Sequence, residues 1–202
     1  DNGATDEGGA YVYLGSAAGP ASVPSVSLDN PVNQADAHFG WSVATAGDIN
    51  VNGYSELLVG APVQANPTVG EGNVFVYYGT LTGVPTFPSG TFDNPGAQDG
   101  GFGFSAVGVG DVNGDVNPDV AIGALYQDNG ATDEGNAFLF NGCYCGVIRT
   151  TPVTTTLDNP DDQANALFGQ SVSGAGDVNG DGFADLVVGA LVQDGAAANE
   201  GM

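Results

Sequence analysis

Three loops of alternating acid and amide residues are the strongest chemical signal in the sequence. Each loop spans nine residues from an aspartate, and its positions 1, 3, 5 and 9 carry side-chain oxygens. Ca²⁺ takes six to eight oxygen ligands, which a tight loop can supply from alternate positions. The candidate ligands are Asp48, Asn50, Asn52 and Glu56 in the first loop, Asp111, Asn113, Asp115 and Asp119 in the second, and Asp177, Asn179, Asp181 and Asp185 in the third.

The three loops differ in how well they suit a cation. The third has three carboxylates and Gly182 at position 6, where the chain must bend sharply. The second keeps three carboxylates but has Val116 at position 6, and Pro118 restricts the bend further. The first keeps Gly53 but offers two carboxylates. We therefore expect up to three Ca²⁺ sites, the third strongest and the first weakest. Mg²⁺ is disfavoured because it demands near-ideal octahedral geometry, and zinc because it prefers nitrogen and sulfur ligands.

The same loops also admit an interpretation without metal. Asp and Asn side chains can hydrogen-bond their own backbone two residues on, and such Asx turns need no cation. Three loops of the same pattern at matching places favour the metal interpretation over this alternative.

These loops belong to a unit that recurs three times. The unit opens at Phe39, Phe102 and Phe168, which are 63 and 66 residues apart, with the sequences FGWSV, FGFSA and FGQSV. After each loop comes a buried-looking run, LLVGA, VAIGA or LVVGA. An aromatic run and a weaker run before DNP complete the unit. Because the runs are β-branched or aromatic and are bounded by Gly, Pro, Asn and Asp, the unit predicts four short strands.

The nearly continuous apolar character of these strands predicts that both faces of each sheet are covered. Four-stranded sheets stacked radially around an axis satisfy this requirement, so we expect an all-β fold of β-propeller blades. A single sandwich ranks second because it predicts cleaner alternation. The recurring aromatic pairs Tyr11/Tyr13 and Phe75/Tyr77 are expected to lie in the core.

The composite pattern resembles the FG-GAP repeat, which builds the propeller of integrin alpha chains and occurs in many bacterial secreted and surface proteins. Phe-Gly is followed by the acidic loop and then by Gly60-Ala61-Pro62, which becomes Gly-Ala-Leu at 123–125 and 189–191. The resemblance covers essentially the whole chain. It implies four-stranded blades, calcium hairpins at the same three loops, and about seven blades in a full propeller.

The two ends of the sequence fall inside blades, since residues 1–8 repeat 128–135 letter for letter. We expect one repeat array over 1–202, made of half-blade 1–38, full blades 39–101 and 102–167, and half-blade 168–202. Propellers generally need about four to eight blades, so three blades' worth should not close a ring. Two explanations stay open: the remaining blades belong to a longer chain, or other copies of this chain complete the half-blades through strand pairing.

Composition excludes several classes of partner. The chain has one Lys+Arg against 24 Asp+Glu, for a net charge of −23, so nucleic-acid binding is excluded. No apolar run approaches the roughly 20 residues that membrane insertion needs. Cys143 and Cys145 could form a local or intermolecular disulfide, stay free thiols, or take part in metal or redox chemistry. No catalytic motif is found, so no enzyme is expected.

The function expected from these features is that of a non-enzymatic, calcium-binding structural or adhesion module, secreted or at a cell surface. A subunit of a surface fibre or assembly is the concrete form of this hypothesis. The alternatives are a Ca²⁺-dependent, lectin-like carbohydrate-binding propeller and a non-catalytic domain of a larger secreted enzyme. Expected partners are protein or glycan ligands at a cell surface.

Overall fold

The computed structural model describes residues 3–66, 69–143 and 154–194. Within these ranges the chain forms twelve strands and no helix. The strands are β1 (Gly9–Val12), β2 (Val26–Asp29), β3 (Val43–Gly47), β4 (Glu56–Ala61), β5 (Asn73–Tyr77), β6 (Gly90–Asp93), β7 (Phe102–Gly110), β8 (Asp119–Ala124), β9 (Asn136–Phe140), β10 (Thr155–Asp158), β11 (Phe168–Gly176) and β12 (Asp185–Ala190).

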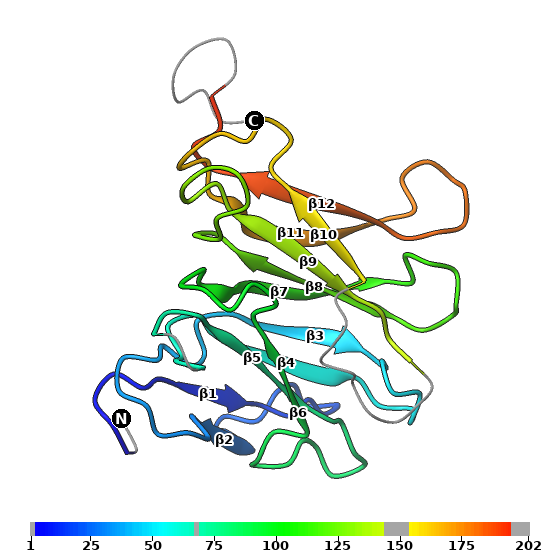
Figure 1. Ribbon diagram of the computed structural model, residues 1–202. Helices are drawn as coiled ribbons and strands as arrows, with labels where there is room; N and C mark the ends of the chain where they lie inside the picture. Colours follow the sequence, from blue (N-terminus) through cyan, green and yellow to red (C-terminus); the bar gives the residue numbers. More distant parts are fainter. Residues whose placement is uncertain (1–2, 67–68, 144–153, 195–202) are drawn as a thin grey trace.

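The strands form four antiparallel sheets in which neighbours in space are neighbours in sequence. Sheets β3–β4–β5–β6 and β7–β8–β9–β10 have four strands each, whereas β1–β2 and β11–β12 are two-stranded. The sheets lie one upon the next, with β1–β2 at one end of the stack and β11–β12 at the other (Figure 1). The predicted all-β fold of four-stranded blades is therefore confirmed. The described residues form an open stack rather than a closed ring.

Burial explains why the inner strands carry continuous apolar runs. Every residue of β5, β8 and β9 is buried, because each of these strands has a neighbour on both edges and a sheet on both faces. One core cluster lies between the two four-stranded sheets and includes Leu58, Phe102 and Ile122. A second joins Val59 and Phe75 of the second sheet to the first sheet. The core of the molecule is thus a series of seams between successive sheets.

The glycines of the repeat motif mark the closest approach between sheets. Gly123, in β8, lies against the backbone of Gly169, in β11 of the next sheet, where an added Cβ would fall inside the 3.0 Å that real Cβ atoms keep from other atoms. The Ser105 hydroxyl donates a hydrogen bond of 2.8 Å to the Gly169 carbonyl at the same point. One sheet earlier, Ser42 donates to Gly103 at the same distance. The motif residues therefore set the spacing of the stack.

The aromatic pairs behave differently in the two sheets compared. Phe75 and Tyr77 are 3% and 0% exposed, as predicted, but Tyr11 and Tyr13 are 63% and 50% exposed. The core prediction is wrong for Tyr11 and Tyr13 because β1, unlike β5, pairs along one edge only among the described residues. Within 3–66, 69–143 and 154–194, no further strand pair covers the two tyrosines.

Candidate metal-binding loops

The three acidic loops occupy equivalent places in successive sheets. They connect β3 to β4, β7 to β8 and β11 to β12, and all three project from the same side of the stack (Figure 1). In each loop the position-9 carboxylate is the first residue of the second strand: Glu56, Asp119 and Asp185. Strand pairing therefore fixes one end of the ligand set in each loop.

The backbone N–H groups of the third loop donate hydrogen bonds to side-chain oxygens of the same loop. Asp177 Oδ1 accepts the N–H groups of Gly180 (2.7 Å) and Asp181 (3.0 Å), and its Oδ2 accepts that of Gly182 (2.9 Å). Asn179 Oδ1 accepts the Asp181 N–H at 2.9 Å. Asp185 Oδ2 reaches back to the Val178 N–H at 2.8 Å. The loop is therefore held in one shape by hydrogen bonds to its oxygens.

The first and second loops have the same pattern of hydrogen bonds. The position-9 carboxylate accepts the position-2 N–H in both, at 2.7 Å from Ile49 to Glu56 and 2.9 Å from Val112 to Asp119. The position-1 aspartate again accepts the N–H groups of positions 5 and 6. The remaining candidate side chains take the same places: Asn50 accepts the Asn52 N–H, Asn52 accepts the Tyr54 N–H, Asn113 accepts the Asp115 N–H, and Asp115 accepts the Asn117 N–H.

Backbone strain separates the third loop from the other two. Each loop needs left-handed backbone at positions 4 and 6, and the third loop has glycine at both, Gly180 (φ 78°) and Gly182 (φ 93°). The second loop has Val116 at position 6 (φ 74°) and the first has Val51 at position 4 (φ 57°). A β-branched residue in this region is an outlier that costs on the order of 1–3 kcal/mol. The strain at Val116 was predicted from the sequence, whereas that at Val51 was not.

Burial and hydrogen bonding shift the pKa values of the loop carboxylates in opposite directions. Desolvation by burial is the main cause that raises the pKa values of Glu56 and Asp119, and hydrogen bonds from backbone N–H groups offset it in part. The pKa of Asp177 is lowered, first by the Gly182 N–H. Partial desolvation raises the pKa of Asp111, but four backbone N–H groups outweigh it and leave that pKa below its ordinary value. In the second and third loops, position 1 is therefore an anion that the loop stabilises.

The donor set fits a hard cation in chemistry, since every candidate side chain offers oxygen. Among the described residues, no three His, Cys, Asp or Glu side chains gather closely enough to hold a metal by themselves. A cation in these loops would therefore also need the Asn carbonyls and main-chain oxygens. The observed hydrogen bonds are those of Asx turns, the alternative that the sequence also allowed. The twelve ligand assignments stay predictions.

Adjacent loops contact one another along the stack. The Ala184 N–H of the third loop donates to the Asp111 carbonyl of the second at 2.8 Å. The ring of Phe183 lies over Gly114, and Pro118 of the second loop lies against Gly47 at the start of the first. The shape of one loop is therefore tied to that of its neighbour.

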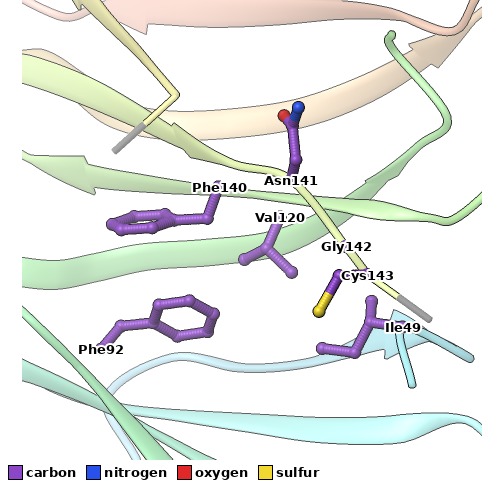
Figure 2. A pocket seen from close by; sticks show the side chains of 7 residues that line it. All are labelled: Ile49, Phe92, Val120, Phe140, Asn141, Gly142 and Cys143. Carbon is purple, nitrogen blue, oxygen red and sulfur yellow. The ribbon is translucent and has the colours of Figure 1, made fainter. Parts of the chain in front are cut away.

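The first loop also packs against the residues that directly follow β9 in the next sheet. Figure 2 shows Cys143 beside Ile49, next to Phe92, Val120 and Phe140 at the end of the seam. The Cys143 N–H donates to the Ile49 carbonyl at 3.4 Å. The cavity here is about 10 Å³, room for one water at most. Cys143 is disulfide-bonded, so of the states left open by the sequence it is not a free thiol; Cys145 lies outside the described residues.

A second feature lies between the two four-stranded sheets. A hollow of about 290 Å³ is lined by Trp41, Phe104 and Tyr126, with His38 and Asp99 among the polar groups. Trp41 is 53% exposed and Tyr126 is 45% exposed. The Trp41 ring stands 4.9 Å from that of Phe104 and 5.7 Å from that of His38. The hollow is therefore aromatic, open to solvent and edged by a carboxylate.

Comparison with known proteins agrees with the repeat. The FG-GAP repeat family model matches residues 39–77 and 168–200. The chain is 33% identical to integrin alpha-4 of Xenopus laevis over 161 residues, which cover 79% of the chain and 15% of that protein. It is 35% identical to integrin alpha-7 of Rattus norvegicus over 118 residues (58% of the chain, 10% of that protein), and 34% identical to integrin alpha-5 of Xenopus laevis over 176 residues (80% and 15%).

The chain therefore belongs to the FG-GAP repeat family, and its relatives include integrin alpha chains. It spans about 10–15% of the length of these relatives. In the part of the chain that the structure describes, no helix has the length and apolar character needed to cross a membrane.

Proposed function

We propose that this chain is a non-enzymatic, calcium-stabilised structural or adhesion module that works outside the cell or at its surface. Membership of the FG-GAP repeat family, with integrin alpha chains as relatives, supports this role. The carrying observation is that three acidic loops share one hydrogen-bonded shape at equivalent places on successive sheets.

Calcium is proposed to bind all three loops, through Asp177, Asn179, Asp181 and Asp185 most tightly and through Asp48, Asn50, Asn52 and Glu56 least tightly. Asp111, Asn113, Asp115 and Asp119 form the intermediate site. The third loop ranks first because Gly180 and Gly182 adopt left-handed backbone without the strain of Val51 or Val116. The first loop ranks last because it offers two carboxylates, whereas the other loops offer three. When bound, each cation would also cancel two of the 23 net negative charges.

The test is thermal unfolding and calorimetric titration of the full chain in Ca²⁺, Mg²⁺ and EGTA. A ligand present at 100 times its Kd stabilises the folded state by about 2.7 kcal/mol. For a chain of this size that corresponds to a rise in melting temperature of roughly 5–10 °C. Mg²⁺ at equal ionic strength controls for charge screening. Equal melting temperatures in Ca²⁺ and EGTA, with no titration heat, would overturn the proposal.

A pair of matched variants locates the strongest site. We expect Asp177→Asn to weaken the tightest binding step at least tenfold. Asp162→Asn removes the same charge from the exposed β10–β11 connection, outside the loops, and should leave that step unchanged. Equal affinities for the two variants would assign the effect to net charge instead of to the loop.

The hollow beside Trp41 favours a second candidate function, Ca²⁺-dependent carbohydrate binding. Its volume of about 290 Å³ is close to that of ordinary ligand pockets, and aromatic faces beside a carboxylate suit a sugar ring with its hydroxyl groups. Glycan-array binding that is lost in EGTA and in Trp41→Ala would support this candidate. Binding that survives both changes would exclude it.

A further inference from the structure

Six asparagines of the chain are each followed by glycine. Asparagine loses ammonia most readily in this sequence, because glycine has no side chain to hinder attack by its own nitrogen. Five of the pairs lie within the described residues: Asn52–Gly53, Asn113–Gly114, Asn129–Gly130, Asn141–Gly142 and Asn179–Gly180. The sixth, Asn2–Gly3, begins outside them. In an unfolded chain the five pairs should react alike, so any difference between them comes from the fold.

Carboxylates hold four of the five glycine nitrogens. Each of these N–H groups donates a hydrogen bond of 2.7–2.8 Å to an aspartate of an acidic loop. The bonds join Gly53 to Asp48, Gly114 to Asp111, Gly142 to Asp119, and Gly180 to Asp177. Hydrogen bonds to an ionised acceptor are stronger than those between neutral groups. Each nitrogen would have to give up such a bond before it could close a ring on its own asparagine.

Gly130 is the exception among the five. Its N–H donates no hydrogen bond to the described residues. Carboxylate oxygens of Glu134 and Asp162 would lie 3.6 Å from a Cβ built at Gly130, but neither accepts the N–H. Asn129 and Gly130 are exposed, and their β8–β9 connection lies on the side of the stack opposite the acidic loops (Figure 1). Water therefore reaches a pair whose nitrogen is not tied.

We propose that Asn129 is a site of spontaneous modification, where deamidation converts the carboxamide to a carboxylate. The Gly130 nitrogen attacks Cγ of Asn129 and gives up its proton, the Cγ–Nδ2 bond breaks, and the amide leaves as ammonia. Water then opens the cyclic imide at either carbonyl. The product is aspartate in the original chain, or isoaspartate in which the chain runs through the side-chain carbonyl. Both products carry one new negative charge, and water is the only co-reactant.

The preceding sheet supplies an internal comparison. Asn66, the equivalent of Asn129, hydrogen-bonds the Asp93 side chain, just as Asn129 Nδ2 donates to Asp158 Oδ2 at 2.7 Å. The residue after Asn66 is proline, whose nitrogen carries no hydrogen and cannot form a neutral imide. The two loops therefore share the bond between amide and carboxylate, but only the later loop has a nitrogen that can remove the amide.

Deamidation would break the contact that holds this loop to β10. A carboxylate in place of the Asn129 amide cannot donate to Asp158, and two like charges at this separation repel each other. The same loop is joined to the β10–β11 connection, because the Phe168 N–H donates to the Glu134 carbonyl at 2.8 Å. Phe168 is the first residue of β11. We therefore expect the modification to loosen the start of β11, and with it the seam to the last sheet.

Timed peptide mapping of the full chain tests the site. The chain is kept in mildly alkaline buffer made with heavy-oxygen water, so that each new carboxylate is labelled, and EGTA is present so that calcium does not contribute. We expect Asn129 to react at least tenfold faster than the four tied asparagines. In urea the five should react at similar rates, because their hydrogen bonds are lost. A folded chain in which a tied asparagine reacts first, or in which Asn129 does not react, would overturn the proposal.

Two variants test the site and its protection separately. Asn129→Gln keeps an amide but needs a larger ring, so label at this position should disappear; label that persists there would contradict the mechanism. Asp177→Asn gives the Gly180 N–H a neutral acceptor in place of a charged one. Labelling of Asn179 should then rise at least threefold while that of Asn129 stays the same. An unchanged rate at Asn179 would refute protection by the carboxylates.

Hydrogen exchange measures the structural consequence. Asn129→Asp carries the charge of the product. Asn33→Asp is the matched control, because it adds the same charge to the exposed β2–β3 connection, where the Asn33 side chain makes no hydrogen bond to the described residues. We expect the Phe168 N–H to exchange at least fivefold faster in Asn129→Asp than in the parent, and Asn33→Asp to match the parent. Equal exchange in the two variants would overturn the expected loosening of β11.

Discussion

The substitution Gly123→Ala tests whether the repeat glycines set the spacing between sheets. In the structure a Cβ at Gly123 would overlap the carbonyl of Gly169 in the next sheet. A carbonyl belongs to the backbone and cannot rotate aside, so β7–β10 and β11–β12 would have to separate by roughly 1 Å. That displacement would also break the 2.8 Å hydrogen bond from Ser105 to Gly169.

The expected loss follows from these two effects. Overpacking of this kind costs about 1–3 kcal/mol, and the broken hydrogen bond adds about 1 kcal/mol. Alanine returns about 0.4–1 kcal/mol by restricting the unfolded chain. The net expectation is a loss of about 1–3.5 kcal/mol in the free energy of unfolding. For a chain of this length, the melting temperature should fall by roughly 2–14 °C.

The assay is urea unfolding followed by circular dichroism. Gly189→Ala is the internal control, because among the described residues a Cβ at this motif position comes close only to the Ser171 hydroxyl. We expect Gly189→Ala to lose less than about 1 kcal/mol, since a rotating side chain can yield. If the two variants lost equal stability, or if Gly123→Ala lost none, the account of the motif glycines would be refuted.

Three further predictions follow from the structure. Val116→Gly should raise the free energy of unfolding by about 1 kcal/mol, because it relieves left-handed strain (φ 74°) at an 87% exposed site. Urea unfolding measures this change, and a lower free energy of unfolding in the variant would contradict the prediction. Asn94→Ala should lower the same free energy by about 2–3 kcal/mol, because it leaves the buried Gln127 amide oxygen without the 3.0 Å bond that it accepts, and an unchanged urea midpoint would contradict this. Asp93→Asn should be more stable than the parent at pH 7 in EGTA. Burial raises the pKa of Asp93 above its ordinary 3.8, so protonation stabilises the parent as the pH falls. The difference in unfolding free energy between the variant and the parent should therefore shrink as the pH approaches 3.8, and a difference that grows would contradict this.

The sequence predicted the strand order because the signals for it are local. Each strand is a short apolar or aromatic run between turn residues, and its repetition at a spacing of 63 and 66 residues removed the ambiguity of any single run. The extra strain at Val116 could be predicted for the same reason, since a position in a turn determines its own backbone conformation.

Features that depend on the neighbouring sheet could not be predicted in this way. Asn30 donates to Gln64 at 3.0 Å, and Asn94 donates to Gln127 at the same distance, so buried amides join the end of one sheet to the next. In the sequence these residues look like ordinary loop amides. Tyr11 shows the converse error: its pattern is that of a core residue, but its exposure depends on a strand pair that the described residues do not supply.

The link between adjacent acidic loops means that a cation would act on the seams as well as on its own hairpin. The second and third loops are joined by the Ala184–Asp111 hydrogen bond and by Phe183 lying over Gly114. Both loops also carry carboxylates at positions 1, 5 and 9, so without counter-ions their repulsion opposes the sheet contact that the motif glycines require. In a stack where each sheet contacts only its neighbours, stability is set by such contacts. Calcium in the third loop should therefore stabilise the seam between β7–β10 and β11–β12 more than the seam between β3–β6 and β7–β10. Hydrogen exchange of β7 and β11, compared with β3, measures this difference, and equal protection on adding calcium would contradict it.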